Sequence, residues 1–597
     1  MESLPDGLYV TNRRYYLLFS ILLVTTPPVS TRVGKNIFAA MEHMTPLKDI
    51  EEALVSHART YVAQQRQMME DLRPFKDELE EAVQVASRLQ SDREYMGNPV
   101  DAFKLMKRLA SDWDDLNAYM EQQEPIATIL EQENVQWESV SGGDEDTPQW
   151  LDSYDNHKPP VSRWGYDVGV AGVNFDRNWT HMYENYAPTA KDVHGSLVAF
   201  LRLQDIYFIE ARHFADGDVP MIKPSKLQLS AADCMAIAKV ALENKRYVRM
   251  KEWSLEALRL IEDPSQSYRH GNTSRAAVYE YLAYVYFLDN DAVNALKYTQ
   301  LLLEASPDSA VAQRNIQYYE WYANKGLPMP NVETTYMNQA RALIVHGQQQ
   351  AYVQACVNKK TKLKGVLDES KIRCFYKRDH PLLVLKPLKV SQMHDNPPVL
   401  VFHDFISNNT AEKLKKMAIP RMKVSRIVHM VTGDLSEAFY RVSKNMFLLP
   451  DVPSDMVVND ALHPLFEAAT GLSMKYAETL QLNNYGLGGQ YETHHDYGEP
   501  GTLLDKDAHG NRLATLLFYL SQVEYGGHTV FPHMGLSLSP QKGDAVFWYN
   551  LLRNGSGIVR TWHASCPVLS GSKWVANKWI RMAGNEFKYR CSRNRFE

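Results

Sequence analysis

The sequence predicts a multidomain α+β protein, with helical domains in its N-terminal half and an antiparallel β-sandwich or barrel at its C-terminal end. Three observations support this: an apolar heptad pattern between residues 47 and 89, five helix-length segments between residues 230 and 323, and short strands with glycine and proline turns from residue 399 onward. At 597 residues, the chain is too long for one ordinary core. The expected order is a leader (1–30), an N-terminal helical and dimerisation domain (31–225), a repeat domain (226–325), a linker with a disulfide (326–395) and the β domain (396–597).

The first 30 residues have the pattern of a signal peptide. Arg13 and Arg14 precede an apolar stretch, residues 15–24, and Pro27 and Pro28 follow it. The apolar core is about half of the ~20 residues that a transmembrane helix needs, and no later segment is apolar enough to span a bilayer. We expect cleavage near residue 30 and a lumenal protein, with an uncleaved signal anchor as the alternative. Four glycosylation sequons agree with this location: Asn178, Asn272, Asn408 and Asn554.

The heptad pattern of the N-terminal domain predicts a coiled coil or a pair of packed helices. Its main seam contains Tyr61, Met68, Phe75, Ala82 and Leu89, and charged residues occupy the other faces. A proline within the pattern, at position 74, predicts a kink or a break there. Self-association through this seam is the favoured interpretation, and an ordinary amphipathic helix packed in its own domain is the alternative.

The repeat domain is predicted from five helical segments with short breaks. The segments cover residues 231–243, 247–261, 274–288, 292–305 and 309–321. Paired helices of this length resemble tetratricopeptide units, which stack around a concave groove. Tyr281 and Tyr284 lie on one helical face, and aromatic rings in a groove suit proline-rich extended peptides. Core packing of these tyrosines is the equally supported alternative.

The charge and the cysteines limit the classes of function. The net charge of -6 argues against a nucleic-acid partner, because phosphate binding needs a basic face. In a lumenal protein, proximity in sequence favours disulfides between Cys356 and Cys374 and between Cys566 and Cys591, which leaves Cys234 free. The absence of a Cys-x-x-Cys motif argues against a zinc site or a thioredoxin-type centre.

The C-terminal domain contains a pattern typical of a metal site. In an extended strand, side chains alternate between faces, so His494 and Asp496 point one way and His495 the other. A third ligand from a distant strand, His563, completes two histidines and one carboxylate. Such a facial triad leaves positions of Fe(II) open for a co-substrate and O2. We expect His528 and His533 to be loop or surface residues, because the triad is already supplied.

Lys573 indicates which co-substrate such a site would take. 2-Oxoglutarate needs a metal for its keto-acid end and a buried cation for its far carboxylate. Lys573 fits the second role, and Thr515 and Tyr485 are predicted to hydrogen-bond the same carboxylate. Three tryptophans are predicted to form dry walls: Trp548, Trp574 and Trp579.

From residue 484 to about residue 591, the chain resembles the catalytic domain of the animal collagen prolyl 4-hydroxylase alpha subunits. The block Asn98-Pro99-Val100-Asp101-Ala102-Phe103-Lys104-Leu105-Met106-Lys107-Arg108-Leu109 is similar to that family's N-terminal domain, and the resemblance covers nearly the whole mature chain. It implies a double-stranded β-helix (jelly-roll) catalytic domain with Fe(II) held by His494, Asp496 and His563. It also implies that Lys573 pairs with 2-oxoglutarate.

The resemblance further implies an activity, a substrate and partners. The reaction would be oxidative decarboxylation of 2-oxoglutarate with hydroxylation of C4 of a proline in X-Pro-Gly sequences, with L-ascorbate rescuing oxidised iron. The repeat domain would bind collagen-like peptide, with Tyr281 and Tyr284 as contacts and Tyr247 as a weaker candidate. The family's alpha subunits form α2β2 tetramers with protein disulfide isomerase in the endoplasmic reticulum lumen.

Two positions depart from the family pattern. The residue eight positions after Lys573 is often a histidine that assists co-substrate binding or decarboxylation, and here it is Arg581. The residue between the first two ligands is usually aromatic, and here it is His495. Two other functions stay open: a 2-oxoglutarate dioxygenase acting on another secreted peptide, and a catalytically weak subunit that binds procollagen.

Overall fold

The structure is a computed structural model. It describes residues 48, 80, 83–84, 96–112, 188–269, 271, 273–326, 348–357, 372–428, 432–438 and 440–594. Residues 1–30 and nearly all of the heptad segment 47–89 lie outside this set, so the signal peptide and the coiled coil stay predictions. The chain divides into two compact units, one of residues 1–35, 46–88 and 105–193 and one of residues 36–45, 89–104 and 194–597. Among the described helices, none has the length and apolar character needed to cross a membrane.

The described chain begins with helices. α4 covers Pro99–Lys107 and is followed by a π-helical turn, Arg108–Asp112. Two helices then precede the repeat domain: α8 covers Ala190–Tyr207 and α9 covers Ala211–Ala215.

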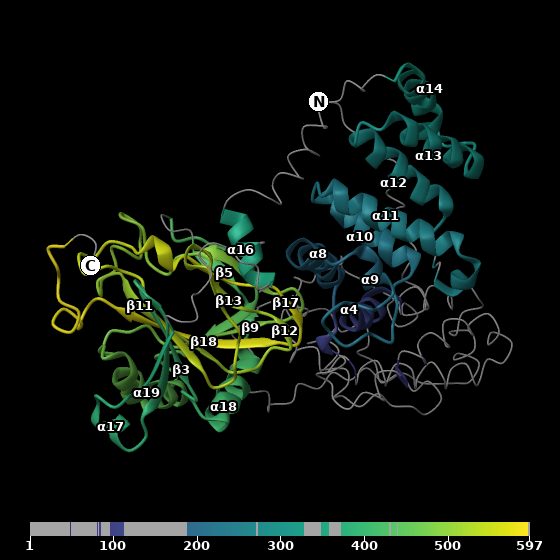
Figure 1. Cartoon of the computed structure of the whole chain (residues 1–597). Helices are drawn as coiled ribbons and strands as arrows, with labels where there is room; N and C mark the ends of the chain where they lie inside the picture. The colour runs from purple at the N-terminus through teal and green to yellow at the C-terminus, as the bar shows by residue number, and fades with distance from the viewer. Residues whose placement is uncertain are drawn as a thin grey trace, which may run out of the picture. The chain divides into compact units, whose positions relative to one another are not determined.

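Five successive helices form the repeat domain, each packed on the previous one (Figure 1). They are α10 (Ala231–Glu243), α11 (Tyr247–Glu262), α12 (Arg275–Leu288), α13 (Ala292–Ala305) and α14 (Ala310–Lys325). The predicted segments are confirmed to within a few residues. Side-chain oxygens of Ser230, Ser274, Asp291 and Ser309 cap four of these helices by accepting a backbone N–H of the first turn. Ser230 and Asp291 precede predicted helical segments, whereas Ser274 and Ser309 were predicted as the first residues of theirs.

The C-terminal domain is built on two antiparallel sheets, as predicted. The larger sheet has nine strands, in the order β1 (Arg373–Lys377), β2 (Leu388–Asp395), β3 (Pro398–His403), β15 (Ala545–Tyr549), β11 (Arg512–Tyr519), β18 (Lys573–Arg581), β9 (Gln481–Tyr485), β8 (Lys444–Phe447) and β4 (Lys423–Val424). The smaller sheet has five strands, in the order β14 (Leu536–Leu538), β13 (Thr529–Phe531), β16 (His563–Ser565), β10 (Gln490–His494) and β7 (Arg441–Val442). Two short ribbons pair β12 (Tyr525–Gly526) with β17 (Val568–Ser570) and β5 (Arg426–Val428) with β6 (Leu435–Glu437). Part of the segment expected to be a linker, residues 373–395, therefore provides two strands of the larger sheet.

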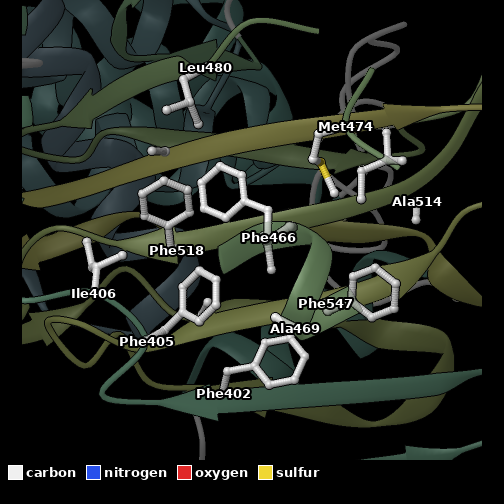
Figure 2. Close-up of a cluster of buried hydrophobic side chains, with 14 of the residues drawn as sticks. Phe402, Phe405, Ile406, Phe466, Ala469, Met474, Leu480, Ala514, Phe518 and Phe547 are labelled. Carbon is white, nitrogen blue, oxygen red and sulfur yellow. The ribbon is translucent and has the colours of Figure 1, made fainter. Parts of the chain in front are cut away.

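The central strands of the larger sheet are buried on both faces. One face packs against α18 (Asn408–Ala418) and α19 (Pro453–Thr470), where Phe466 of the helix meets Phe405 and Phe518 (Figure 2). The other face carries a second apolar cluster that includes Leu517 and, from the smaller sheet, Phe531. Because side chains alternate along a strand, neighbouring residues of β11 enter different clusters. The metal motif lies on the side of the smaller sheet.

The disulfide differs from the prediction. Cys356, in α16 (Gln348–Val357), is bonded to Cys566, and Cys374 and Cys591 are free and exposed. The prediction paired cysteines that are close in sequence. In the structure, α16 packs against β13 and β14, and β13 pairs with β16, the strand that directly precedes Cys566. Cys234 is free, as expected, and buried.

Candidate active site

The paired strands β10 and β16 bring the predicted metal ligands together. His494 ends β10, His563 begins β16, and the two residues are directly opposite each other in the sheet. Asp496 follows two positions after His494 on the same side. One ligand atom from each of the three residues lies within 4.8 Å of the other two. Both His563 and Asp496 are buried, and His494 is half-buried.

Hydrogen bonds fix how the two histidines face the carboxylate. The Nδ1 of His494 donates to the backbone carbonyl of Glu492 (2.8 Å), and the Nδ1 of His563 donates to that of Thr561 (3.0 Å). A carbonyl accepts only, so each Nδ1 carries the proton and each Nε2 presents a lone pair. Both Nε2 atoms lie 3.7 Å from an oxygen of Asp496. Burial lowers the pKa of His494, so this ring stays neutral. Two lone pairs and a carboxylate that face one another suit a shared cation, and the donor set fits Fe(II).

Asp496 is held by a hydroxyl from the neighbouring strand. Thr515 of β11 donates to its Oδ2 (2.7 Å), and the amide of Asn550 donates to the Thr515 hydroxyl (2.9 Å). Burial alone would raise the pKa of Asp496, but the His563 and His494 rings, the Arg512 charge and the Thr515 hydroxyl hold it below its usual range. Thr515 was expected beside the far carboxylate of the co-substrate. The structure instead places it behind a metal ligand, because cross-strand neighbours decide its contacts.

Lys573 is a buried cation without an ion pair among the described residues. Its Nζ donates to the hydroxyls of Ser565 (2.8 Å) and Thr529 (3.3 Å), and its nitrogen lies 5.6 Å from the ring centre of Tyr485. The hydroxyl of Tyr519 also donates to Thr529 (2.8 Å), which leaves the Thr529 proton free to donate. Burial lowers the pKa of Lys573 to about 7. A buried ammonium with hydroxyl partners favours a nearby anion that would pair with it.

Ser565 and Thr529 were not predicted. Strand alternation could have found Ser565, because it lies two residues after His563 in the same strand and so on the same face. Nothing in the sequence pairs Thr529 with Lys573.

Three family models match the sequence. The prolyl 4-hydroxylase alpha-subunit N-terminal region matches residues 40–147, the prolyl 4-hydroxylase peptide-substrate-binding domain matches residues 231–325, and the 2OG-Fe(II) oxygenase superfamily matches residues 480–581. The prolyl 4-hydroxylase subunit alpha-1 of Bos taurus is 32% identical, over 97% of this chain and 100% of its own length. The chain belongs to the prolyl 4-hydroxylase alpha-subunit family.

The comparisons also found a nematode relative and a solved viral structure. The prolyl 4-hydroxylase subunit alpha-1 of Caenorhabditis elegans is 29% identical, over 93% of this chain and 90% of its own length. Among solved structures, the 2OG complex of the viral collagen prolyl hydroxylase of Paramecium Bursaria Chlorella virus-1 is 25% identical, with a TM-score of 0.25, and the match covers 31% of this chain and 95% of that chain. Membership of the 2OG-Fe(II) oxygenase superfamily implies Fe(II) and 2-oxoglutarate.

The remaining histidines of this prolyl 4-hydroxylase family member lie outside the triad. The ring of His495 is stacked between those of Tyr497 (4.6 Å between ring centres) and Trp562 (5.5 Å). His495 therefore takes the structural place of the aromatic residue that the family usually has there. His533 packs against the edge of Trp562, and His528 is half-buried. Among the described residues, the group that could hold a metal includes none of these three.

The three tryptophans expected to line the site lie in different surroundings. Trp548 packs edge-on against His563, with 4.8 Å between ring centres. Trp574 belongs to the core on the helical side of the larger sheet, so its prediction as a wall was wrong. Its neighbour Lys573 already occupies the site face, and alternation sends Trp574 to the other. Trp579 lies beneath the guanidinium of Arg512 (3.6 Å).

In the peptide-substrate-binding domain, the predicted tyrosines differ in exposure. Tyr284 is 39% exposed and Tyr281 is half-buried, whereas Tyr247 is 5% exposed and belongs to the core. Sequence reasoning missed Tyr318 and Trp321 of α14, which are 38% and 50% exposed. Their spacing of three residues is the signal that singled out Tyr281 and Tyr284 in α12.

Proposed function

We propose that the chain is a catalytic prolyl 4-hydroxylase alpha subunit, which hydroxylates proline in X-Pro-Gly sequences of collagen-like chains with 2-oxoglutarate and O2. One observation carries the proposal: a cluster of two histidines and one carboxylate lies in the same domain as a buried lysine that has no ion pair among the described residues. A binding subunit would need neither feature, because each costs stability when left without its ligand.

In this proposal, His494, Asp496 and His563 hold Fe(II). The metal would supply the redox chemistry that couples decarboxylation of 2-oxoglutarate to hydroxylation. The protein residues bind and orient. The two Nδ1–H bonds to backbone carbonyls fix the rings, and Thr515 fixes the carboxylate, so that little reorganisation accompanies metal binding.

Lys573 would bind the far carboxylate of 2-oxoglutarate. Its ammonium supplies the charge, and the hydroxyls of Thr529 and Ser565, each of which keeps a proton to donate, supply further hydrogen bonds. Tyr485, whose pKa burial raises to about 12, stays a neutral phenol at this site. The hydroxyl-rich wall would therefore orient the co-substrate by its carboxylate.

The repeat domain would bind the substrate peptide. Exposed aromatic rings continue from α12 to α14: Tyr284 contacts Phe287 (6.4 Å between ring centres), and Phe287 contacts Tyr318 (6.3 Å). Flat apolar rings suit proline-rich chains, whose preformed helix loses little entropy on binding. We assign substrate contacts to Tyr281, Tyr284, Tyr318 and Trp321.

Other features follow from the family. L-Ascorbate would restore oxidised iron, protein disulfide isomerase would form the beta subunit of an α2β2 tetramer, and the endoplasmic reticulum lumen would be the location.

The decisive test uses the alpha subunit co-expressed with protein disulfide isomerase. Incubation with Fe(II), 2-oxoglutarate, ascorbate and a (Pro-Pro-Gly) repeat peptide should give succinate and 4-hydroxyproline in equal amounts. The variants His494→Ala and His563→Ala should form neither product while keeping the wild-type circular dichroism spectrum. Turnover on a different secreted peptide alone would favour another dioxygenase, and peptide binding without any turnover would favour a binding subunit.

A further inference from the structure

Arg581 occupies the position where this family often has a histidine, and its contacts lead away from the co-substrate wall. It ends β18, and its side chain is 9% exposed. Its Nη2 lies 2.9 Å from Oε1 of Glu478, and its Nη1 donates to the backbone carbonyl of Gly510 (2.8 Å). The carboxylate of Asp507 lies 3.5 Å from Nη2. All these partners lie on two segments, one around residue 478 and one just before β11.

Glu478 is shared between two arginines. Arg512 approaches it with two donors, Nε to Oε1 (2.7 Å) and Nη2 to Oε2 (2.8 Å), in a bidentate pair. The guanidinium of Arg581 forms an ion pair with the same Oε1. The backbone N–H of Glu478 also donates to the carbonyl of Trp579 (2.9 Å), which ties this carboxylate to β18. Glu478 is only 20% exposed, so solvent screens the cluster weakly.

Arg512 links this cluster to the metal ligands. Its guanidinium lies flat over the ring of Trp579, and its Nη1 is 3.5 Å from the backbone carbonyl of Asp496. Glu478 uses the opposite edge of the same planar group. A shift of Glu478 would therefore displace Arg512 from its position beside Asp496.

The second partner of Arg581 is the segment that joins Asp496 to β11, residues 497–511. Asn511 closes the base of this segment, because its side chain accepts from the N–H of Gly498 and donates to the carbonyl of Gly498, both at 2.8 Å. Arg581 anchors the closed segment through Gly510. A histidine offers at most two diverging N–H donors, whereas arginine offers five in one plane. The arginine at this position contacts Glu478 and Gly510 together.

We propose that Arg581 is a positioning residue, which through Glu478 holds Arg512 beside Asp496 and through Gly510 anchors residues 497–511. In this role Arg581 supports the carboxylate of Asp496 indirectly, through Arg512. The inference rests on the proposed function for its kinetic consequences, but its structural part does not depend on the substrate.

The test compares Arg581→Met, Arg581→Lys and Glu478→Gln, each in the alpha subunit with its isomerase partner. Calorimetry with Mn(II) and 2-oxoglutarate should give a Kd within about twofold of wild type for Arg581→Met, because the co-substrate contacts remain. Hydroxylation should fall about tenfold in kcat, with succinate exceeding hydroxyproline, as is typical when a residue that supports a metal ligand is lost. Arg581→Lys should keep part of the activity, because it keeps the charge near Glu478.

Two further measurements separate positioning from a general loss of stability. Hydrogen–deuterium exchange of residues 497–511 should accelerate in metal-free Arg581→Met. The double variant with Glu478→Gln should lose less kcat than the two single losses combined, because the two residues share one cluster. Arg421→Met is the matched control, since Arg421 makes a bidentate pair with Asp455 (2.8 and 2.6 Å) elsewhere in the domain and should change none of these readouts.

Opposite results would overturn the inference. A rise of more than about tenfold in the 2-oxoglutarate Kd of Arg581→Met would make Arg581 a co-substrate contact. Additive losses in the double variant, or unchanged exchange of residues 497–511, would refute the shared cluster. If the wild-type protein does not hydroxylate the (Pro-Pro-Gly) peptide, the proposed function fails, but the exchange and calorimetry still decide the role of Arg581.

Discussion

The affinity for 2-oxoglutarate should fall steeply as the pH rises above neutral. Burial lowers the pKa of Lys573 to about 7, and among the described residues this ammonium has only hydroxyl partners. A bound carboxylate would raise the pKa of Lys573 again, because an opposite charge stabilises the protonated form. Above pH 7, the Lys573 amine of the free protein is increasingly neutral, so binding of 2-oxoglutarate must be accompanied by uptake of a proton by this amine.

The size of the effect follows from this shift. With a free-state pKa of about 7 and a lysine that stays protonated in the complex, the apparent Kd scales as one plus the ratio of neutral to charged lysine in the free protein, which is a rise of about 25-fold between about pH 6.5 and about pH 8.5. At about pH 8, each 2-oxoglutarate bound should take up about 0.9 proton.

Calorimetry of the Mn(II)-loaded protein, in buffers of different ionisation enthalpy, measures both quantities without turnover. Lys573→Arg is the matched control, because a guanidinium stays charged throughout this range and its affinity should not depend on pH. An affinity of the wild-type protein that is flat across the range, or binding without proton uptake, would refute the reasoning.

Four other perturbations have defined outcomes. Asp496→Ala should abolish Fe(II) binding and hydroxylation with an unchanged circular dichroism spectrum, and residual full activity would contradict the ligand assignment. Thr515→Val should weaken Fe(II) binding about tenfold, because it removes the hydrogen bond to the Asp496 carboxylate. Thr515→Ser should bind Fe(II) as the wild type does, because it keeps the hydroxyl, and equal Fe(II) affinities of the two variants would show that this hydrogen bond does not support binding. Tyr284→Ala should raise the KM for long (Pro-Pro-Gly) peptides about fivefold, roughly the loss of one aromatic contact, and leave the KM for 2-oxoglutarate unchanged, whereas no change in the peptide KM would remove Tyr284 from the groove. Phe518→Ala should lower the free energy of unfolding in urea by about 3–5 kcal/mol, because the ring is fully buried, and a loss under ~1 kcal/mol would mean that the core refills the cavity.

The sequence predicted those parts of the site that depend on local geometry. The period of two along a strand placed His494 with Asp496 and turned His495 away, because it needs no knowledge of the partner strand. Helix caps such as Ser230 and Ser309 were predictable for the same reason, since their hydrogen bonds stay within one turn. The repeat domain was accordingly predicted almost residue by residue.

Contacts between distant segments were harder to predict. Thr515 was predicted beside the co-substrate carboxylate, whereas its hydroxyl donates to Asp496, because the register of β11 against its neighbours determines which group it faces. Cys356 was paired by proximity in sequence, whereas a helix carries it to Cys566, 210 residues later. Trp574 is different, because the alternation that placed Lys573 in the site already excluded it. That error came from treating large aromatic residues as a group.

The pairing of His494 with His563 links metal affinity to strand register. A slip of one residue between β10 and β16 would place Trp562 or Ala564 opposite His494 instead of His563, and every side chain of the slipped strand would change faces. A cation bound by both strands thus favours one alignment over its neighbours. The 68 residues between the two histidines include strands that pair with one another and with strands outside this segment. Lengthening one of their exposed turns would cost little, because each doubling of a loop adds only ~0.6 kcal/mol to the entropic free energy of closing it. Lineages could therefore vary these turns widely while the metal continues to select the correct alignment as the chain folds.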